Sequence, residues 1–144
     1  QEIDRCSRFQ TSLGLIMLDL DKFKKINDTY GHLYGDYILK EVGKIIKENV
    51  RTIDVVGRFG GEEFSVILVN TNVRDCIPLA KRIVEGINRK TFIFDGIATN
   101  LTISAGMSGY PSMSKESKEL IKMADDAMYQ TKKKGGNDVT IFQS

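Results

Sequence analysis

Cysteines, long apolar runs and net charge are all scarce in this chain, and each scarcity disfavours a class of protein. The two cysteines, Cys6 and Cys76, lack metal-ligand spacing, so we expect small buried helix residues in a reduced, cytoplasmic compartment rather than a disulfide framework. The longest apolar stretch, LGLIMLDL, is too short to span a bilayer. A net charge of +2 is too small to indicate nucleic-acid binding.

The remaining bulk properties are those of one folded domain. The chain has 144 residues, of which 41% are hydrophobic and 28% charged. We find no repeat, linker, low-complexity tract or signal peptide, and we predict a single domain over residues 1–144. The opening segment, QEIDRCSRFQ, reads as the end of a helix without a capped start. We therefore expect the chain to be part of something longer.

The order of apolar patterns predicts an α+β domain. Ser12–Leu20 is apolar at nearly every position, which is typical of a central strand buried on both faces. The other predicted elements are a short helix ending near Gly31, a helix starting at Gly35–Asp36, hairpin strands at Asp54–Phe59 and Glu63–Val69, a helix over 73–90, two or three strands over 91–110, a helix from a Ser114–Ser117 capping box to Gly135, and a strand at Asp138–Phe142. This order favours a mixed, largely antiparallel central sheet flanked by helices.

The first predicted strand ends in two carboxylates, Asp19 and Asp21. A carboxylate at the end of a buried strand is costly unless something positive meets it. Mg²⁺ or Mn²⁺ is one solution, because hard cations prefer carboxylate oxygens. An acidic cap for the following helix is the other, and we favour it for Asp21.

A second acidic group stands at the tip of the predicted hairpin, in the sequence GGEE. Gly60 and Gly61 permit positive φ and remove side-chain bulk there. Consecutive strand residues point to opposite faces, so we expect one of Glu62 and Glu63 to join Asp19 while the other points elsewhere. A solvated turn with surface charge is the alternative.

Basic residues near these carboxylates indicate a phosphate ligand. A helix start follows Asp19 and Leu20, and such a start offers free N–H groups to phosphate. Lys24 lies one turn into that helix, and KKKGG at 132–136 adds further lysines, whose alternative role is to pair with a helix dipole. Acidic metal ligands, a phosphate-binding helix start and lysines together describe a nucleoside triphosphate site.

At these residues the sequence resembles a known family. RFGGEEF resembles the signature of GGDEF domains, the diguanylate cyclases, and LDLDKFKKINDTYGHLYGD, TISAG and ADDAMYQTKKKGGN resemble its other motifs in order along nearly the whole chain. The resemblance implies a fold like nucleotide cyclases and polymerase palms. It implies condensation of two GTP into cyclic di-GMP with release of two pyrophosphates, dependence on Mg²⁺ or Mn²⁺, a face-to-face homodimer, and sensor or receiver domains in a parent protein that is cytoplasmic or membrane-anchored.

The resemblance also assigns roles to residues. It implies metal ligation by Asp19, Glu62 and the backbone carbonyl of Leu20, with Glu63 as the second catalytic carboxylate. It implies that Asn27 and Asp36 bind guanine. The residues that it implies contact the substrate are Lys22, Phe23, Lys24, Asn27, Asp36, Gly60, Gly61 and Lys132. RTID, from Arg51 to Asp54, resembles the product-inhibition motif RxxD, with Arg82 in support. A surface ion pair is the alternative for Arg51 and Asp54.

Two departures from the family pattern keep other functions open. Gly136 stands where family members usually carry a phosphate-binding arginine, and the usual upstream segment DxLTGLxNRR is absent. A receptor module that binds cyclic di-GMP or GTP with little turnover is therefore the alternative function. A different nucleotide cyclase or a phosphodiesterase on a related fold is a third hypothesis. We interpret His32 as structural.

Overall fold

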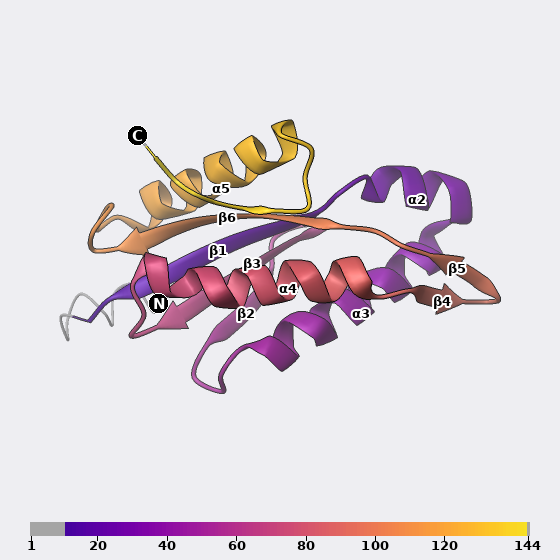
Figure 1. Ribbon diagram of the computed structural model, residues 1–144, viewed down its shortest axis with the longest axis horizontal. Helices are drawn as coiled ribbons and strands as arrows, with labels where there is room; N and C mark the ends of the chain where they lie inside the picture. Colours follow the sequence, from indigo (N-terminus) through magenta and orange to yellow (C-terminus); the bar gives the residue numbers. More distant parts are fainter. Residues whose placement is uncertain (1–10, 144) are drawn as a thin grey trace.

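A central five-stranded sheet organises the computed structural model, which describes residues 11–143 (Figure 1). The strands in spatial order are β2 (Val55–Arg58), β3 (Glu63–Val69), β1 (Leu13–Leu20), β6 (Ile103–Tyr110) and β7 (Val139–Ile141). Every neighbouring pair is antiparallel except β6 and β7, which run parallel. The predicted fold class, a mixed and largely antiparallel sheet, is confirmed.

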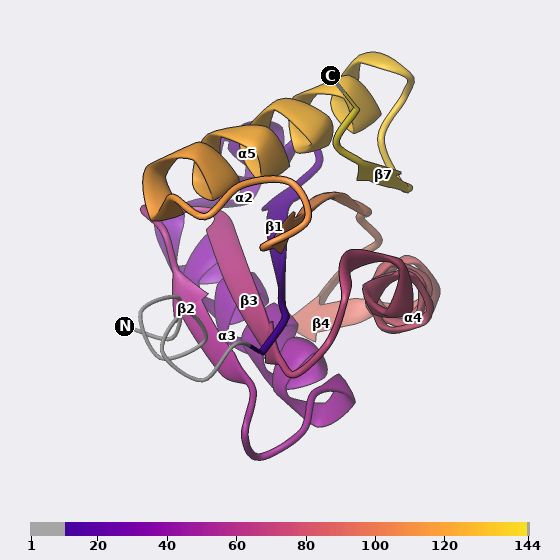
Figure 2. The same ribbon diagram turned by 90° about the vertical axis from the view of Figure 1, so that its left-hand side faces the viewer.

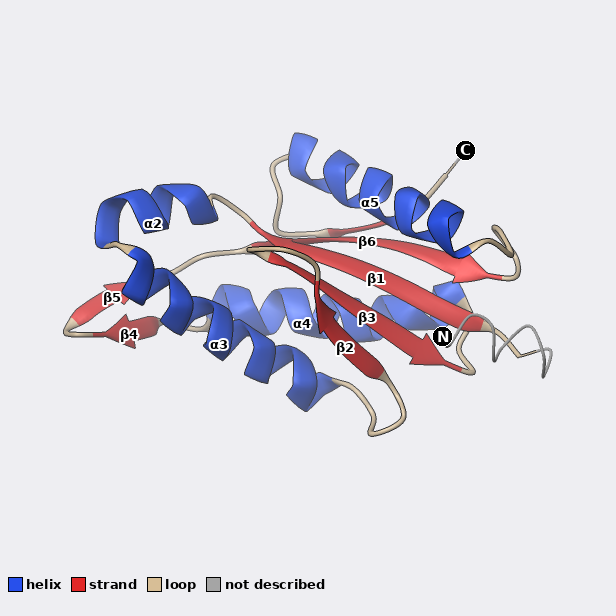
Figure 3. Cartoon of the chain, turned by 180° about the vertical axis from the view of Figure 1, so that it is seen from behind, coloured by secondary structure: helices blue, strands red, loops and turns tan. Residues whose placement is uncertain are grey.

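Helices cover both faces of this sheet, as the edge-on view in Figure 2 shows. On one face lies α5 (Ser117–Lys133), and on the other lie α3 (His32–Asn49) and α4 (Ile77–Arg89), the latter preceded by a 3₁₀ turn at Val73–Cys76. Beyond the end of β1 lies α2 (Phe23–Tyr30), as Figure 3 shows. A separate hairpin of β4 (Phe92–Phe94) and β5 (Ile97–Thr99) extends past the main sheet near α3.

The two-sided burial of β1 explains its unbroken apolar sequence. Leu15 and Met17 pack into the core beneath α5, whereas Ile16 and Leu18 pack into the larger core beneath α3 and α4. Because side chains alternate along a strand, Asp19 follows Met17 onto the α5 face. The predicted strand at Ser12–Leu20 is thus confirmed. The alternation of side chains along it places the Asp19 carboxylate on the face of the sheet that α5 covers.

The hairpin of β2 and β3 is also confirmed. A backbone bond of 2.8 Å from the Phe59 N–H to the Glu63 carbonyl closes its tip. Gly60 has φ +82°, a left-handed conformation that glycine adopts without strain. The Arg58 guanidinium donates to the Gly61 carbonyl at 2.7 Å and so ties the loop to its own strand.

The start of α3 differs from the prediction. The helix begins at His32, so Asp36 lies in its second turn rather than at its start. Gly31, with φ +91°, turns the chain between the helices, and its carbonyl accepts the Gly35 N–H at 3.2 Å. The prediction at Gly35–Asp36 was wrong because one glycine completes the turn, and Gly35 is a buried residue within the helix.

The capping box predicted for α5 was also wrong. The helix begins at Ser117 with Glu116 as its N-cap residue, and no side chain caps it. Ser114 Oγ accepts a hydrogen bond from the Glu116 N–H at 3.0 Å, so the Ser114 hydroxyl stabilises the turn before the helix rather than the helix itself. The end of the helix near Gly135 is confirmed, since α5 stops at Lys133 and Gly135 has φ +117°.

The cysteine prediction holds where the structure tests it. Cys76 is fully buried, and burial, with a smaller contribution from Asp75, raises the pKa of its thiol to about 12. Such a thiol stays protonated and unreactive at neutral pH. Cys6 and the helix end predicted within QEIDRCSRFQ lie outside the described residues. Among residues 11–143, no helix is both long and apolar enough to cross a membrane.

Candidate active site

Asp19 is the centre of the candidate site, at the carboxyl end of β1. Its side chain is only 18% exposed, and its Oδ1 atom is buried without a hydrogen-bond partner. Asp19 stands opposite Glu63 in the β1–β3 register, so the two side chains share the α5 face of the sheet. An unpartnered buried carboxylate oxygen is costly, which makes this atom a candidate ligand for a cation.

Both glutamates of the hairpin tip act on Asp19. Burial, with smaller contributions from the Glu62 and Glu63 carboxylates, raises the pKa of Asp19 to about 7 despite the opposing charge of Lys132. The Glu62 carboxyl group therefore lies near that of Asp19. The expectation that only one glutamate joins Asp19 was therefore wrong. Glu62 precedes β3, so strand alternation does not turn its side chain away.

Lys132 is the cation that reaches this cluster from α5. Its ammonium group donates to Asp21 Oδ1 at 3.0 Å and to the Leu20 carbonyl at 3.2 Å. It also lies 3.8 Å from Asp19 Oδ2. One lysine thus contacts all three residues at the end of β1, including two of the groups predicted to bind metal.

Asp21 does not cap the following helix, contrary to our prediction. Its carboxylate accepts hydrogen bonds at 2.6–3.0 Å from Thr102 Oγ1, Ser104 Oγ, Lys132 Nζ and the Asn137 N–H. Burial opposes ionisation of Asp21, but these donors outweigh it and hold its pKa below the usual value. Asp21 therefore joins β1, β6 and the turn after α5 at the edge of the site.

Asp125 is a residue of the cluster that the sequence analysis missed. Burial raises its pKa, its Oδ1 atom is buried without a partner, and its charge helps to raise the pKa of Glu63 after burial itself. It precedes Lys132 by seven residues, a spacing that places both on one face of a helix. That spacing was the available signal, but only the packing of α5 on the sheet shows which face meets Glu63.

The first residues of α2 follow directly from the acidic strand end. Lys22, at the N-cap position, has φ 59°, and no side chain caps the helix. Phe23 is buried and anchors the turn, whereas Lys22 and Lys24 are exposed. An uncapped helix start with two exposed lysines offers backbone N–H groups and positive charge three to five residues after Asp19.

Asn27 occupies a space that only glycine leaves open. Its Oδ1 atom is buried without a hydrogen-bond partner. A Cβ atom on Gly35 would collide with that oxygen and lie 3.1 Å from Phe23 Cζ. Asp36, next to Gly35, is exposed in the second turn of α3. The packing of α2 on α3 thus places Asn27 against Gly35, the residue that precedes Asp36 in the sequence.

Arg51 and Asp54 form a closed ion pair away from Asp19. The guanidinium donates to both carboxylate oxygens at 2.9 and 3.0 Å and to the Val69 carbonyl at 2.7 Å. The Arg51 side chain is 51% exposed and that of Asp54 fully buried. Arg82, on α4, makes long contacts of 3.4 Å to Asn49, which precedes Arg51 by two residues in the sequence.

The turn after α5 explains one departure from the family pattern. Gly136 has φ +75°, and a Cβ atom there would lie 2.5 Å from Asp21 Oδ2. A larger residue at this position would have to move the Asp21 carboxylate or the turn itself. Gly60 and Gly61, by contrast, are exposed, and a Cβ atom on either would meet no atom within 4 Å.

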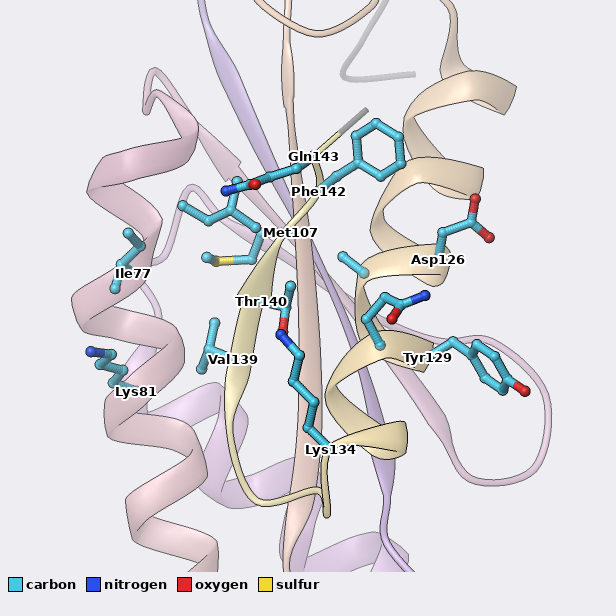
Figure 4. Close-up of a pocket in the computed structure, with 13 residues that line it drawn as sticks. Ile77, Lys81, Met107, Asp126, Tyr129, Lys134, Val139, Thr140, Phe142 and Gln143 are labelled. Carbon is cyan, nitrogen blue, oxygen red and sulfur yellow. The ribbon is translucent and has the colours of Figure 1, made fainter.

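A cavity of about 700 Å³ lies apart from this cluster, between α4 and α5 beside β7 (Figure 4). Lys81, Lys134, Tyr129 and Phe142 are among the residues that line it, and none of the predicted site residues does. The carboxylate cluster and this cavity are therefore separate features of the structure.

The residues present fit a divalent cation that completes its coordination elsewhere. Within residues 11–143, no three His, Cys, Asp or Glu side chains are arranged to hold a metal ion by themselves. The predicted ligand set contains two carboxylates, Asp19 and Glu62, and the Leu20 carbonyl. Mg²⁺ characteristically takes one or two protein carboxylates and fills its remaining positions with water and substrate phosphates.

Comparison with known proteins gives matches along the whole chain. A family model described as "Diguanylate cyclase, GGDEF domain" matches residues 1–138. Diguanylate cyclase A of Treponema denticola is 44% identical over 133 residues, which are 92% of this chain and 36% of that protein. The chain spans about a third of the length of the curated relatives it matches.

Solved structures agree with this match. The active GGEEF domain of a diguanylate cyclase from Vibrio cholerae superposes with a TM-score of 0.91 at 29% identity, covering 99% of this chain and 90% of that one. The GGDEF domain of DgcB from Caulobacter crescentus, solved in complex with c-di-GMP, gives a TM-score of 0.89 at 26% identity and covers 97% and 83% of the two chains.

Proposed function

Because this chain belongs to the GGDEF family of diguanylate cyclases, we propose that it condenses two GTP molecules into cyclic di-GMP and releases two pyrophosphates. The observation that carries the proposal is the buried, unpartnered Oδ1 atom of Asp19 beside Glu62 and Glu63. Those three carboxylates, with one lysine between them and Asp21, favour a site for divalent cation and triphosphate.

The proposed mechanism assigns each side chain a separate task. Asp19, Glu62 and the Leu20 carbonyl hold Mg²⁺ or Mn²⁺, which when bound neutralises charge on the triphosphate. Lys22, Phe23 and Lys24 hold phosphate oxygens at the start of α2, together with Lys132. Glu63, whose pKa is raised by burial, by Asp125 and by Glu62, accepts the proton of the attacking 3′-hydroxyl. Gly60 and Gly61 keep the hairpin tip free of side chains beside the nucleotide.

Guanine selectivity follows from the packing of α2 on α3. We assign the unpartnered Asn27 Oδ1 and the Asp36 carboxylate to the N–H groups of guanine's edge. Adenine has no matching donors there, so its binding would leave the buried acceptor without a partner. Gly35 is required for this reading because any side chain at its position would displace Asn27.

Catalysis requires two copies of the chain. Each site holds one GTP, and each 3′-hydroxyl attacks the α-phosphate on the opposite copy, so two sites must meet face to face as a homodimer. Sensor or receiver domains in the rest of the parent protein would control that meeting, and the assembly would act in the cytoplasm. A structure of SiaD from Pseudomonas aeruginosa, solved with its activator SiaC, is one precedent for a regulatory partner among the structural neighbours.

The test of the proposed function is direct. We expect the chain, incubated with GTP and Mg²⁺, to produce cyclic di-GMP at a rate that rises more steeply than linearly with protein concentration. Replacement Glu63→Gln should lower turnover by about 10²–10⁴-fold, because it removes a general base. Product is measured by chromatography, and Glu85→Gln, an exposed glutamate on α4, is the matched control. Absence of product from a tethered dimer would refute the proposal.

A receptor module is the second candidate, and Gly136 is the observation that favours it. The family's phosphate arginine is missing there, and the turn leaves no room for it beside Asp21. We propose that Arg51 and Arg82 then bind cyclic di-GMP through guanine O6 and N7. The fully buried Asp54 side chain orients Arg51 in this proposal rather than contacting guanine itself.

The same arginines give a prediction for product inhibition in an active enzyme. We expect Arg82→Ala to weaken cyclic di-GMP binding about tenfold, the value of one lost charge-assisted contact, with little loss of stability because its own contacts to Asn49 are long. Arg51→Ala should weaken binding as strongly but also cost about 1 kcal/mol of stability, through the lost bonds to Asp54 and Val69.

Calorimetric titration with cyclic di-GMP and thermal melting separate the two effects. Arg74→Ala, an exposed arginine of the 3₁₀ turn, serves as the control. Unchanged affinity in both variants would mean that Arg51 and Asp54 are only a surface ion pair. Tight binding that these variants lose, in a protein without turnover, would favour the receptor.

A further inference from the structure

Lys132 contacts the same atoms that the proposed function assigns to the metal. Its ammonium group donates to the Leu20 carbonyl at 3.2 Å and lies 3.8 Å from Asp19 Oδ2. A lysine held for phosphate would be expected to point toward solvent beside the helix start of α2. Here it points into the carboxylates, and its side chain is only 27% exposed.

A fixed anchor holds the lysine in this position. Asp21 Oδ1 accepts from Lys132 at 3.0 Å, and the same carboxylate is tied by Thr102, Ser104 and the Asn137 N–H. These three bonds do not involve Lys132, so Asp21 keeps its place whether or not the lysine moves. Lys132 can therefore release the Leu20 carbonyl and Asp19 while its charge stays paired with Asp21.

We propose that Lys132 is a built-in competitor of the divalent cation: it holds the Leu20 carbonyl and Asp19 in the protein without nucleotide, and leaves them for the phosphates when GTP and metal bind together. This rests on the proposed function for the metal ligands and for the identity of the nucleotide. The consequence is that the protein alone binds metal weakly, so the site assembles around metal–nucleotide rather than around free metal.

Coulomb's law sets the expected size of the effect. A lysine charge within about 4 Å of a divalent cation disfavours it even at high dielectric, by an amount that corresponds to at least tenfold in affinity. Replacement Lys132→Met keeps the apolar stem and removes the charge. We expect it to bind Mn²⁺ about tenfold more tightly than the unsubstituted protein, and a non-hydrolysable GTP analogue about tenfold less tightly. A lysine that lay away from the metal ligands would leave the Mn²⁺ affinity unchanged when it is replaced.

The experiment titrates Mn²⁺ into nucleotide-free protein at pH 8 and measures the free ion by electron paramagnetic resonance. Lys133→Met is the matched control, because it removes the same formal charge from the neighbouring residue, whose Nζ lies 5.4 Å from the Tyr129 ring centroid. Lys132→Gln, a second neutral variant, should act in the same direction as Lys132→Met, and melting curves verify that each variant folds.

Tighter Mn²⁺ binding in both Lys132 variants and not in Lys133→Met supports the proposal. Equal or weaker Mn²⁺ binding in folded Lys132 variants overturns it. Neither result depends on turnover. A gain in metal affinity in a protein that makes no cyclic di-GMP would leave this inference standing while the proposed function fails, and unchanged affinity in an active cyclase would do the reverse.

Discussion

Replacing Asp19 by asparagine is expected to remove cyclase activity and, at pH 8 without divalent cations, to make the protein more stable. The folded protein raises the pKa of Asp19 from 3.8 to about 7, chiefly by burial. A group whose pKa is raised on folding favours the fold while it is protonated, below about pH 4, and that contribution is lost as the pH rises toward 7. Ionised Asp19 therefore destabilises the folded protein above neutrality.

The size of this gain can be bounded. A pKa shift of this size corresponds to roughly 4 kcal/mol. Because the carboxylate is partly solvated and its ionisation is coupled to that of Glu62, we expect Asp19→Asn to raise the free energy of unfolding at pH 8 by about 1–3 kcal/mol. Asparagine has nearly the same shape and no charge. The gain should vanish below about pH 4, where Asp19 is protonated in both states. Turnover should fall at least about 10³-fold, because the proposed metal ligand is lost.

Urea denaturation at pH 4 and pH 8 in the presence of a chelator tests the predicted gain in stability. The cyclic di-GMP assay tests the predicted loss of activity. Asp126→Asn is the matched control, since this neighbouring aspartate of α5 is 53% exposed and paired only with Lys122 on the surface. That variant should change stability by less than about 1 kcal/mol. A loss of stability in Asp19→Asn at pH 8 would mean that the carboxylate is structural and that its assignment as a metal ligand is wrong.

Replacing Gly106 by alanine is expected to have the largest effect on the fold. This glycine lies in the middle of β6 and faces α5. A Cβ atom there would collide with the Met128 backbone nitrogen and the Ala124 carbonyl, and would lie 2.7 Å from Met128 Cα. All three are backbone atoms of one helix, so no side-chain rotation can relieve the clash, and α5 would have to move off the sheet.

We expect a loss of about 3 kcal/mol or more, at the upper end of the cost of overpacking a core, and a fall in melting temperature of about 10 °C. Asp125 and Lys132 would move with the helix, so activity should fall as well. Gly43→Ala is the matched control: its Cβ would make an ordinary contact of 3.7 Å with Phe64, and alanine favours the helix by about 1 kcal/mol. A Gly106→Ala protein as stable as the unsubstituted one would contradict this account of the α5–β6 contact.

Local patterns carried most of the fold. The apolar run of β1, the glycines at the hairpin tip and the apolar spacing of α4, where Ala80, Ile83 and Ile87 are fully buried, each predicted an element that the structure confirms. Such patterns are readable because strand and helix periods are set by the backbone itself. The errors were at the ends of elements, as at Asp36 and Ser114. There a single glycine or hydroxyl group determines at which residue the helix begins.

The chemical groups that this protein carries could be read from its amino-acid sequence: an acidic strand end, then an amide and an aspartate, then a glycine-rich tip with two glutamates, and a late lysine, in an order that identifies the family. Which of these groups lie next to one another depends on the tertiary structure. In the structure Asp21 accepts hydrogen bonds from Ser104 and other donors instead of capping a helix, and both Glu62 and Glu63 lie near Asp19. Asp125 lies near Glu63, and Lys132 donates to the Leu20 carbonyl. The reason is that charge effects and hydrogen bonds depend on distance through space, and residues more than a hundred positions apart become neighbours only when α5 packs on the sheet.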